Sequence, residues 1–257
     1  MKFTTPLVLI AAFACGATFA APKAIRTMEQ SGTDEAADVD WSVTGVVISG
    51  IEDRDVQLKI NEELERRAWS PVKSFIHDMT PGNGLVEEGE GLPGGPAGVG
   101  ARNSVDVDVT PQLINGSVLC FEVGIATYSG GAHGNYSMES VILDAKTGKA
   151  LTLEQLVDSA APAEMLEVAK EKLAAEYGAD LEAPTSLGTV VLTREGFDIV
   201  WGLYELGPYA MGTPRVSIPY MSMNEQILFD FAVQSKPKPA APPADPKAGL
   251  EDAVEQK

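Results

Sequence analysis

Histidine is scarce in this chain of 257 residues, which contains only His77 and His133. The two lie far apart, and neither has a second histidine four residues away, the spacing by which one helix face binds zinc. The sequence also has no nucleotide-binding loop and no nucleophile elbow. No two of the 37 acidic residues stand out as the acid and base of a glycosidase. The sequence therefore predicts no metal site, no cofactor and no catalytic residue.

Long apolar runs are absent beyond the first residues. The chain begins MKFTTPLVLIAAFACGATFA, with one lysine, a short apolar run and small residues before Ala21. This pattern is typical of a secretory signal peptide over residues 1–20, cleaved after Ala20, and its apolar run is too short to span a membrane. The sequence thus predicts a periplasmic or extracytoplasmic protein with no membrane span. An alternative is a lipid anchor on Cys15, although the residues before it fit the lipobox pattern poorly.

Cysteine is as rare as histidine. Removal of the signal peptide leaves Cys120 as the only cysteine, which excludes an intramolecular disulfide. Because Cys120 lies within an apolar strand pattern, we expect it to be a small buried core residue rather than a catalytic thiol.

Basic residues are few: the chain has 19 lysines and arginines but 37 acidic residues, which gives a formal net charge of −18. Such a surface repels nucleic acid and attracts cations and basic proteins. Solubility alone is a sufficient alternative explanation for the acidity.

Composition divides the chain beyond the signal peptide into four parts. Residues 21–40, rich in Ala, Thr, Asp and Glu, predict a disordered segment, and the proline-rich residues 232–257 predict a disordered tail. Between them we expect an N-terminal subdomain over 41–127 and a C-terminal domain over 128–231. Residues 81–102 are rich in glycine and predict a long loop.

Each half of the folded part predicts a strand, a helix and then a hairpin. The first helix has apolar residues at every fourth position from Val56 to Val72, can be capped by Asp53 or Asp55, and is expected to kink or divide at Pro71. Hairpin turns are expected at Asn115–Gly116 and at residues 194–196. The sequence therefore predicts an α+β fold of two β-α-β-β-type subdomains, with largely antiparallel sheets packed against helices.

The stretch YSGGAHGNYS (residues 128–137) combines three glycines with a serine and a histidine. A hydrolase would need His133 to act as a base on the Ser129 hydroxyl, with a third group to orient the imidazole, and no such group is evident. The flanking glycines favour mobility or an unusual backbone path rather than a braced site. We therefore expect a structured turn, and keep a small hydrolase using His133 as an alternative.

The stretch WGLYELGPYAMG (residues 201–212) places three aromatic residues in a loop bounded by glycine and proline. Tyrosine and tryptophan rings stack on sugars and anchor protein interfaces. Two hypotheses stay open for Tyr204 and Tyr209: the rings fold back onto the core, or they recognise a ligand.

Four stretches in this order carry a family resemblance: YSGGAHGNYS, LDAKTGKALTLEQLV, LTREGFDIVWGLYELGPYAMG and RVSIPY. Together they resemble the C-terminal domain of the RsiV-like family (DUF3298). The stretch ISGIEDRDVQLKINEELERRA is similar to the companion N-terminal domain (DUF4163) that RsiV shares with PdaC-type deacetylases. In RsiV these extracellular domains belong to a membrane-anchored anti-sigma factor and bind lysozyme. This sequence has no anti-sigma segment and too few histidines for a deacetylase metal site.

The resemblance implies an exported, non-enzymatic binding module of the bacterial cell envelope. Its ligand would be a basic, lysozyme-like muramidase or a peptidoglycan fragment. A structural envelope protein tethered through its proline-rich tail is a further alternative. The candidate binding residues are those of the two glycine-rich stretches: Tyr128, Gly131, His133, Asn135, Tyr204, Pro208 and Tyr209.

Overall fold

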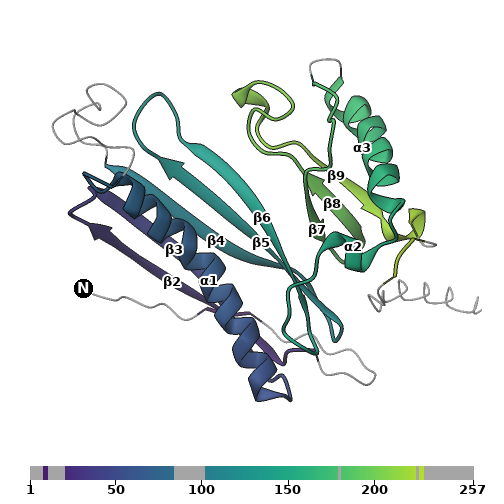
Figure 1. Cartoon of the computed structure of the whole chain (residues 1–257), viewed down its shortest axis with the longest axis horizontal. Helices are drawn as coiled ribbons and strands as arrows, with labels where there is room; N and C mark the ends of the chain where they lie inside the picture. The colour runs from purple at the N-terminus through teal and green to yellow at the C-terminus, as the bar shows by residue number, and fades with distance from the viewer. Residues whose placement is uncertain (1–7, 11–20, 84–101, 179–180, 224–225, 229–257) are drawn as a thin grey trace, which may run out of the picture.

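The computed structural model describes residues 8–10, 21–83, 102–178, 181–223 and 226–228, which form two β-sheets and the helices that cover them (Figure 1). Most of the predicted signal peptide, most of the loop at 81–102 and the proline-rich tail lie outside the described residues. Among the strands of these described ranges, pairing is antiparallel except between β3 and β4. The predicted α+β class with two largely antiparallel sheets is therefore confirmed.

The first sheet has the strand order β1-β2-β3-β4-β5-β6. Its strands are β1 (Val8–Ile10), β2 (Ala24–Asp34), β3 (Val39–Ser49), β4 (Asn103–Ile114), β5 (Val118–Tyr128) and β6 (Asn135–Asp144). The parallel pair of β3 and β4 follows from the long helix α1, which connects them and packs along one face of the sheet (Figure 1). β1 lies within the predicted signal peptide and pairs with the first residues of β2.

The prediction that residues 21–40 are disordered was wrong. β2 pairs with β3 along its whole length, from Ala24 opposite Ser49 to Asp34 opposite Val39. The polar side chains that suggested disorder lie on a strand that β1 pairs with only at residues 25–27, and most of them remain exposed. A Cβ atom at Gly32 would lie 2.6 Å from the Trp41 ring, so the absence of a side chain there lets Trp41 pack over the strand. Backbone pairing, rather than apolar burial along β2, orders this segment.

Helix α1 (Arg54–Met79) begins as predicted. The Asp53 carboxylate accepts hydrogen bonds from the backbone N–H groups of Asp55 and Val56. The side chains at every fourth position are buried against the sheet: Val56, Ile60, Leu64, Ala68 and Val72. Pro71 lies inside the helix, which continues through it to Met79, so the expected division does not occur.

β5 is buried on both faces. Leu119, Phe121 and Val123 pack into the core beneath α1, whereas Val118 and Cys120 pack into a second core with the C-terminal half of the chain. Asn115 forms the predicted turn before β5 by accepting hydrogen bonds from the N–H groups of Ser117 and Val118. Strand β6 falls in the range 128–231 that we assigned to the C-terminal domain, yet it pairs with β5 in the first sheet.

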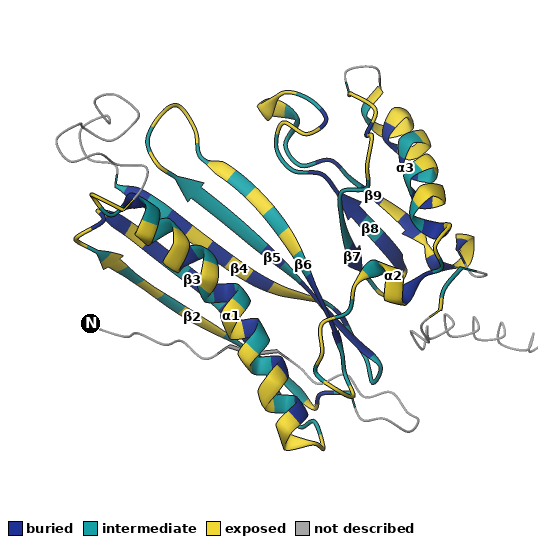
Figure 2. Ribbon diagram, viewed as in Figure 1, coloured by how far each residue is buried: buried dark blue, intermediate teal, exposed yellow. Residues whose placement is uncertain are grey.

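The second sheet has the order β7-β8-β9, with strands β7 (Thr189–Leu192), β8 (Gly196–Val200) and β9 (Arg215–Pro219). Helices α2 (Leu153–Leu156) and α3 (Ala161–Tyr177) pack against it, and Figure 2 shows α3 buried toward the sheet and exposed on its outer side. The Thr152 N–H donates to the Gln155 side chain in a capping box at the start of α2. No helix within the described ranges has an apolar stretch long enough to cross a membrane.

Arg215 on β9 joins the two sheets through charge. Its guanidinium donates to Glu122 on β5 at 2.5 Å and to Asp198 on β8 at 3.4 Å. The Glu122 and Asp198 side chains are only 17 % and 13 % exposed, so water replaces these partners poorly.

Replacing Arg215 by methionine should lower the free energy of unfolding by about 2 kcal/mol, because Glu122 loses a charge-assisted partner while remaining largely buried. Urea unfolding followed by circular dichroism measures this loss. Arg54→Met, at an exposed position near the start of α1, is the matched control. Equal losses in the two variants would contradict the proposed connection.

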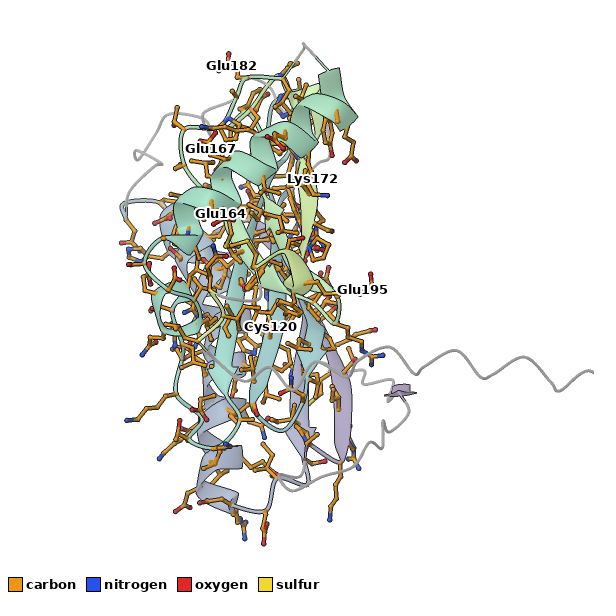
Figure 3. The ribbon with its side chains drawn as sticks, turned by 90° about the vertical axis from the view of Figure 1, so that its right-hand side faces the viewer. Cys120, Glu164, Glu167, Lys172, Glu182 and Glu195 are labelled. Atoms are coloured by element: carbon orange, nitrogen blue, oxygen red, sulfur yellow. The ribbon has the colours of Figure 1, made fainter. Side chains whose placement is uncertain are left out.

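Cys120 should react slowly with thiol reagents in the folded chain. It is buried at the junction of β5 with the second core (Figure 3), and burial raises the pKa of its thiol from 9.0 to about 11. The thiolate fraction at pH 8 should therefore fall about a hundredfold relative to the unfolded chain. Colorimetric thiol titration of the chain beginning at Ala21, with and without denaturant, measures this difference. Equal native and denatured rates would show that Cys120 is accessible.

Candidate binding site

Two loops that are distant in the sequence meet at one end of the molecule. The turn between β5 and β6 contributes His133, and the loop between β8 and β9 contributes Tyr204 and Tyr209. The His133 ring stacks on Tyr209 with centroids 3.9 Å apart, and its Nε2 lies 3.0 Å from the Tyr204 hydroxyl. The two tyrosine rings are 5.7 Å apart. We call His133, Tyr204 and Tyr209 the aromatic edge.

Hydrogen bonding determines the tautomer of His133. Nδ1 lies 2.9 Å from the Gly134 carbonyl oxygen, which can only accept, so Nδ1 carries the proton of the neutral ring. Nε2 then accepts the hydrogen bond from the Tyr204 hydroxyl. Both ring nitrogens are engaged, and within the described part of the chain no hydrogen bond links His133 to Ser129. The serine–histidine pair considered for a hydrolase is therefore not formed in this structure.

Glycine makes the β5–β6 turn possible. Gly130 and Gly131 have φ values of 90° and 98°, a region that residues with a side chain rarely adopt. The Tyr128 hydroxyl donates to the Gly131 carbonyl at 3.1 Å and closes the turn from one side. The turn therefore has the unusual backbone path that its glycines predicted, whereas the contacts that hold His133 in place were not predicted.

The opposite loop contains its own unusual backbone. Tyr204 has φ = 64°, and the adjacent Glu205 N–H donates to the Gly202 carbonyl to form a tight turn. Tyr204 is 57 % exposed and Tyr209 is 37 % exposed, so these rings do not fold back onto the core. Pro208 precedes the short 3₁₀ helix η2 (Tyr209–Met211) and is exposed, as is Asn135 at the start of β6.

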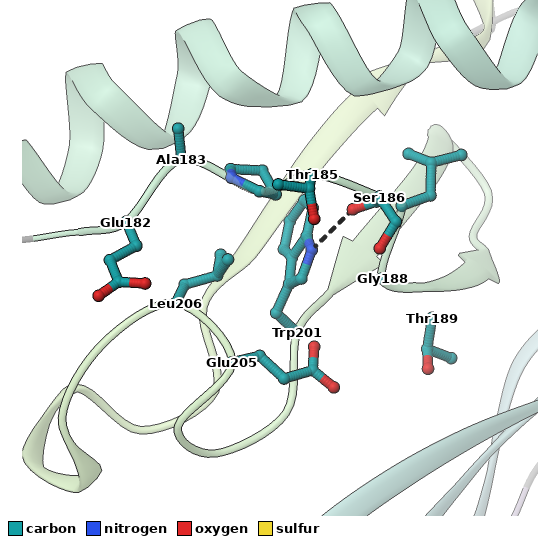
Figure 4. A pocket seen from close by; sticks show the side chains of 11 residues that line it. Glu182, Ala183, Thr185, Ser186, Gly188, Thr189, Trp201, Glu205 and Leu206 are labelled. Atoms are coloured by element: carbon teal, nitrogen blue, oxygen red, sulfur yellow. Dashed lines mark hydrogen bonds between the residues drawn. The ribbon is translucent and has the colours of Figure 1, made fainter.

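A pocket of about 540 Å³ is lined in part by Glu205, the residue that follows Tyr204 of the aromatic edge (Figure 4). It is bounded by the segment that follows α3 and by the first half of the β8–β9 loop, which are joined by a hydrogen bond from the Glu182 N–H to the Leu206 carbonyl at 2.8 Å. The residues that line it are Glu182, Ala183, Pro184, Thr185, Ser186, Leu187, Gly188, Thr189, Trp201, Glu205 and Leu206.

No local sequence pattern predicts this pocket. Residues 182–188 have no helical or strand periodicity, and the only local signal is a polar segment with one proline between two regular elements. The hydrogen bond between Glu182 and Leu206 depends on how the chain folds back on itself, and no local sequence pattern predicts it. The described residues contain no cluster of three or more His, Cys, Asp or Glu side chains arranged to hold a metal ion.

Comparison with known proteins assigns a segment of the C-terminal half to a protein family. Residues 150–221 match the family model described as "Protein of unknown function (DUF3298)". The match includes the pocket and both tyrosines of the aromatic edge, whereas His133 precedes it. Residues 150–221 thus form a DUF3298 domain.

Two crystal structures of DUF3298 family members share the fold of this chain. The protein from Bacteroides fragilis is 16 % identical, with a TM-score of 0.57, and the similarity covers 82 % of this chain and 94 % of the other. The protein from Pseudomonas aeruginosa PAO1 is 15 % identical, with a TM-score of 0.55, and the similarity covers 87 % of this chain and 94 % of the other. At this identity the likeness concerns the fold alone. A search of curated proteins gave no match.

Replacing His133 by alanine should loosen the β8–β9 loop while leaving the two cores intact. The variant loses one hydrogen bond and one ring stack, together about 1.5 kcal/mol, so amide exchange in residues 204–211 should accelerate roughly tenfold. Hydrogen exchange with mass spectrometry measures the rate. Ser129→Ala, at an exposed position of the same turn, should leave it unchanged. A loop that exchanges equally fast in all three proteins would show that His133 does not hold it.

Proposed function

We propose that this protein is an exported, non-enzymatic binding module of the bacterial cell envelope that recognises a basic, lysozyme-like muramidase through the aromatic edge. The observation that carries the proposal is the convergence of two separate loops on an exposed cluster of one histidine and two tyrosines. Exposed, braced aromatic rings are typical anchors of protein interfaces, because they offer large contact area at a small loss of side-chain entropy.

Bracing supports binding because it reduces the ordering cost of complex formation. His133 contacts both tyrosines, and the glycine turn behind it is closed by the Tyr128 hydroxyl. The rings are thus held in position before a partner arrives, so less conformational entropy is lost when one binds.

Charge supports a basic partner. The formal net charge of −18 would steer a cationic protein toward the surface and raise its association rate. Family resemblance in the two loop sequences suggests a muramidase of the lysozyme type as that protein. A peptidoglycan fragment, whose sugar rings could stack on the same tyrosines, is the second candidate ligand.

The hydrolase alternative has less support. Catalysis by His133 needs a ring nitrogen free to take a proton from a nucleophile, and both nitrogens have other partners in this structure. The alternative of tethering through the proline-rich tail concerns residues outside the described ranges.

The proposal predicts that a c-type lysozyme binds the purified protein. Tyr209→Ala and Tyr204→Ala should each weaken this binding and raise its dissociation constant about 10- to 30-fold. Isothermal titration calorimetry at low and at physiological salt measures both effects. The matched control is Met221→Ala, which removes an exposed apolar side chain from another part of the domain, where Met221 is 89 % exposed.

Three outcomes would contradict the proposal. Binding could disappear at physiological salt, an unrelated protein of equal negative charge could bind as well, or the tyrosine variants could bind like Met221→Ala. Binding of peptidoglycan fragments, but not of lysozyme, with loss in the tyrosine variants would reassign the aromatic edge to the second ligand.

A further inference from the structure

The outer edge of β2, the side that faces away from β3, is largely without a neighbouring strand (Figure 1). β2 pairs with β3 over all 11 of its residues, whereas β1 pairs with the outer edge at residues 25–27. β1 belongs to the predicted signal peptide, so cleavage after Ala20 removes it. In the cleaved chain, no strand of the described ranges pairs with the outer edge of β2.

Hydrogen bonding identifies the backbone groups of β2 that point to this edge. The Ile48 N–H donates to Asn61 Oδ1 at 2.8 Å and the Ile48 carbonyl accepts from Asn61 Nδ2 at 3.0 Å, so both groups point away from β2. Ile25 lies opposite Ile48 and is therefore a non-hydrogen-bonded partner, whose own N–H and carbonyl point outward. Because the register is continuous, the residues with outward backbone groups are Ile25, Thr27, Glu29, Ser31 and Thr33.

The outer edge lacks the features that protect edge strands from pairing with other chains. Protected edges are short or carry proline, lysine or a bulge. β2 is 11 residues long, contains neither proline nor lysine, and keeps one register with β3 from end to end. The edge also accepts a strand in this structure, since β1 pairs with it in the antiparallel direction.

We propose that signal-peptide cleavage frees the outer edge of β2 for a second copy of the chain. The two β2 strands pair antiparallel around a two-fold axis beside Gln30 and join the first sheets of both copies into one continuous sheet. This dimer uses a different surface from the aromatic edge and does not depend on the ligand proposed there. It rests on the predicted cleavage after Ala20.

The charges of β2 are complementary in this arrangement. A two-fold axis at Gln30 places Arg26 opposite Asp34 of the second copy, and symmetry repeats the pair. Opposite charges on directly facing strand positions stabilise a sheet, whereas like charges destabilise it. Moving the axis by one residue would place Glu29 directly against Glu29 of the second copy. Charge therefore favours the register centred on Gln30.

Both charged groups are available for this pairing. Arg26 is exposed, and no hydrogen bond or ion pair in the described part of the chain engages its guanidinium. Asp34 Oδ1 accepts hydrogen bonds from the N–H groups of Ala36 and Ala37, which fix the carboxylate at the end of β2. The second oxygen, Oδ2, is left for the arginine of the other copy.

The backbone groups fit the same register. It places Thr27 opposite Thr33 of the second copy and Glu29 opposite Ser31, and all four residues have outward N–H and carbonyl groups. Facing residues can therefore exchange hydrogen bonds as in an ordinary antiparallel ladder. Paired threonines are also favourable cross-strand neighbours.

Met28 provides an apolar contact in the dimer. Its side chain is 36 % exposed, an unusual position for a large apolar group. The register places Met28 opposite Gly32 of the second copy, where the missing side chain leaves the Trp41 ring close to the strand. Methionine packs favourably against aromatic rings, so the contact covers an exposed thioether.

The uncleaved chain cannot form this dimer, because β1 already occupies part of the edge. Val8 pairs with Thr27 and Leu9 pairs with Arg26, two positions that the second copy requires. Cleavage and dimer formation are thus coupled through the same backbone groups.

Sedimentation equilibrium of the chain beginning at Ala21 tests the proposal. The formal net charge of −18 opposes association, so we expect a dimer that dissociates on dilution. Arg26→Glu replaces two opposite-charge pairs by two like-charge pairs and should raise the dimer dissociation constant about tenfold. Arg54→Glu makes the same charge change at an exposed position of α1 and should raise it much less.

Disulfide cross-linking tests the register. Gln30→Cys places two thiols at a non-hydrogen-bonded pair on the two-fold axis, where Cα atoms lie about 4.5 Å apart, within the range of a disulfide. We expect rapid formation of a covalent dimer under mild oxidation. Thr33→Cys lies on the same strand, but its copies are too far apart to bridge in this register and should remain monomeric in denaturing electrophoresis. Cys120 is buried and does not compete.

Four outcomes would overturn the inference. The chain could remain monomeric at every concentration, Arg26→Glu could associate like Arg54→Glu, or Thr33→Cys could cross-link as fast as Gln30→Cys. In the fourth, the chain stays monomeric while a synthetic peptide of residues 5–11 slows amide exchange in β2, which would assign the edge to an extended peptide instead. Circular dichroism of each variant confirms that it is folded.

Discussion

The burial of β5 on both faces is the constraint on which the rest of the structure depends. One face completes the core beneath α1, and the other, through Val118 and Cys120, completes the core of the second sheet. A strand shared in this way couples the stability of both halves, since neither core can lose β5 without exposing apolar surface. Arg215 adds a charged connection farther along the same strand, at Glu122.

Placement of the aromatic edge follows from this sharing. The β5–β6 hairpin belongs to the first sheet and the β8–β9 loop to the second, so the contact of His133 with Tyr204 depends on how the two halves are packed. A small change in that packing would alter the separation of the loops. The site therefore depends on a long-range feature of the fold as well as on the local conformation of two loops.

Local chemistry made much of the fold predictable. Asp53 as the helix cap, the Asn115 turn and the apolar repeat of α1 are features of neighbouring residues, and each was found. β2 was missed because backbone pairing with β3, rather than its composition, orders it. Both loops of the aromatic edge were predicted as recognition elements, but their contact was not, because it joins residues 71 positions apart. The pocket at Glu182 and Glu205 was missed for the same reason.

The DUF3298 match begins at residue 150, after the last strand of the first sheet. Four buried members of the core around β7, β8, β9 and α3 nevertheless come from before that point: Leu113, Val118, Cys120 and Ile142. The segment that matches the family model, residues 150–221, is therefore smaller than the part of the chain that forms a complete hydrophobic core. Another protein that contains such a segment needs other apolar side chains in place of those that β5 and β6 supply here. Where a DUF3298 segment occurs, we expect a preceding hairpin that fills this place, even if its sequence has diverged.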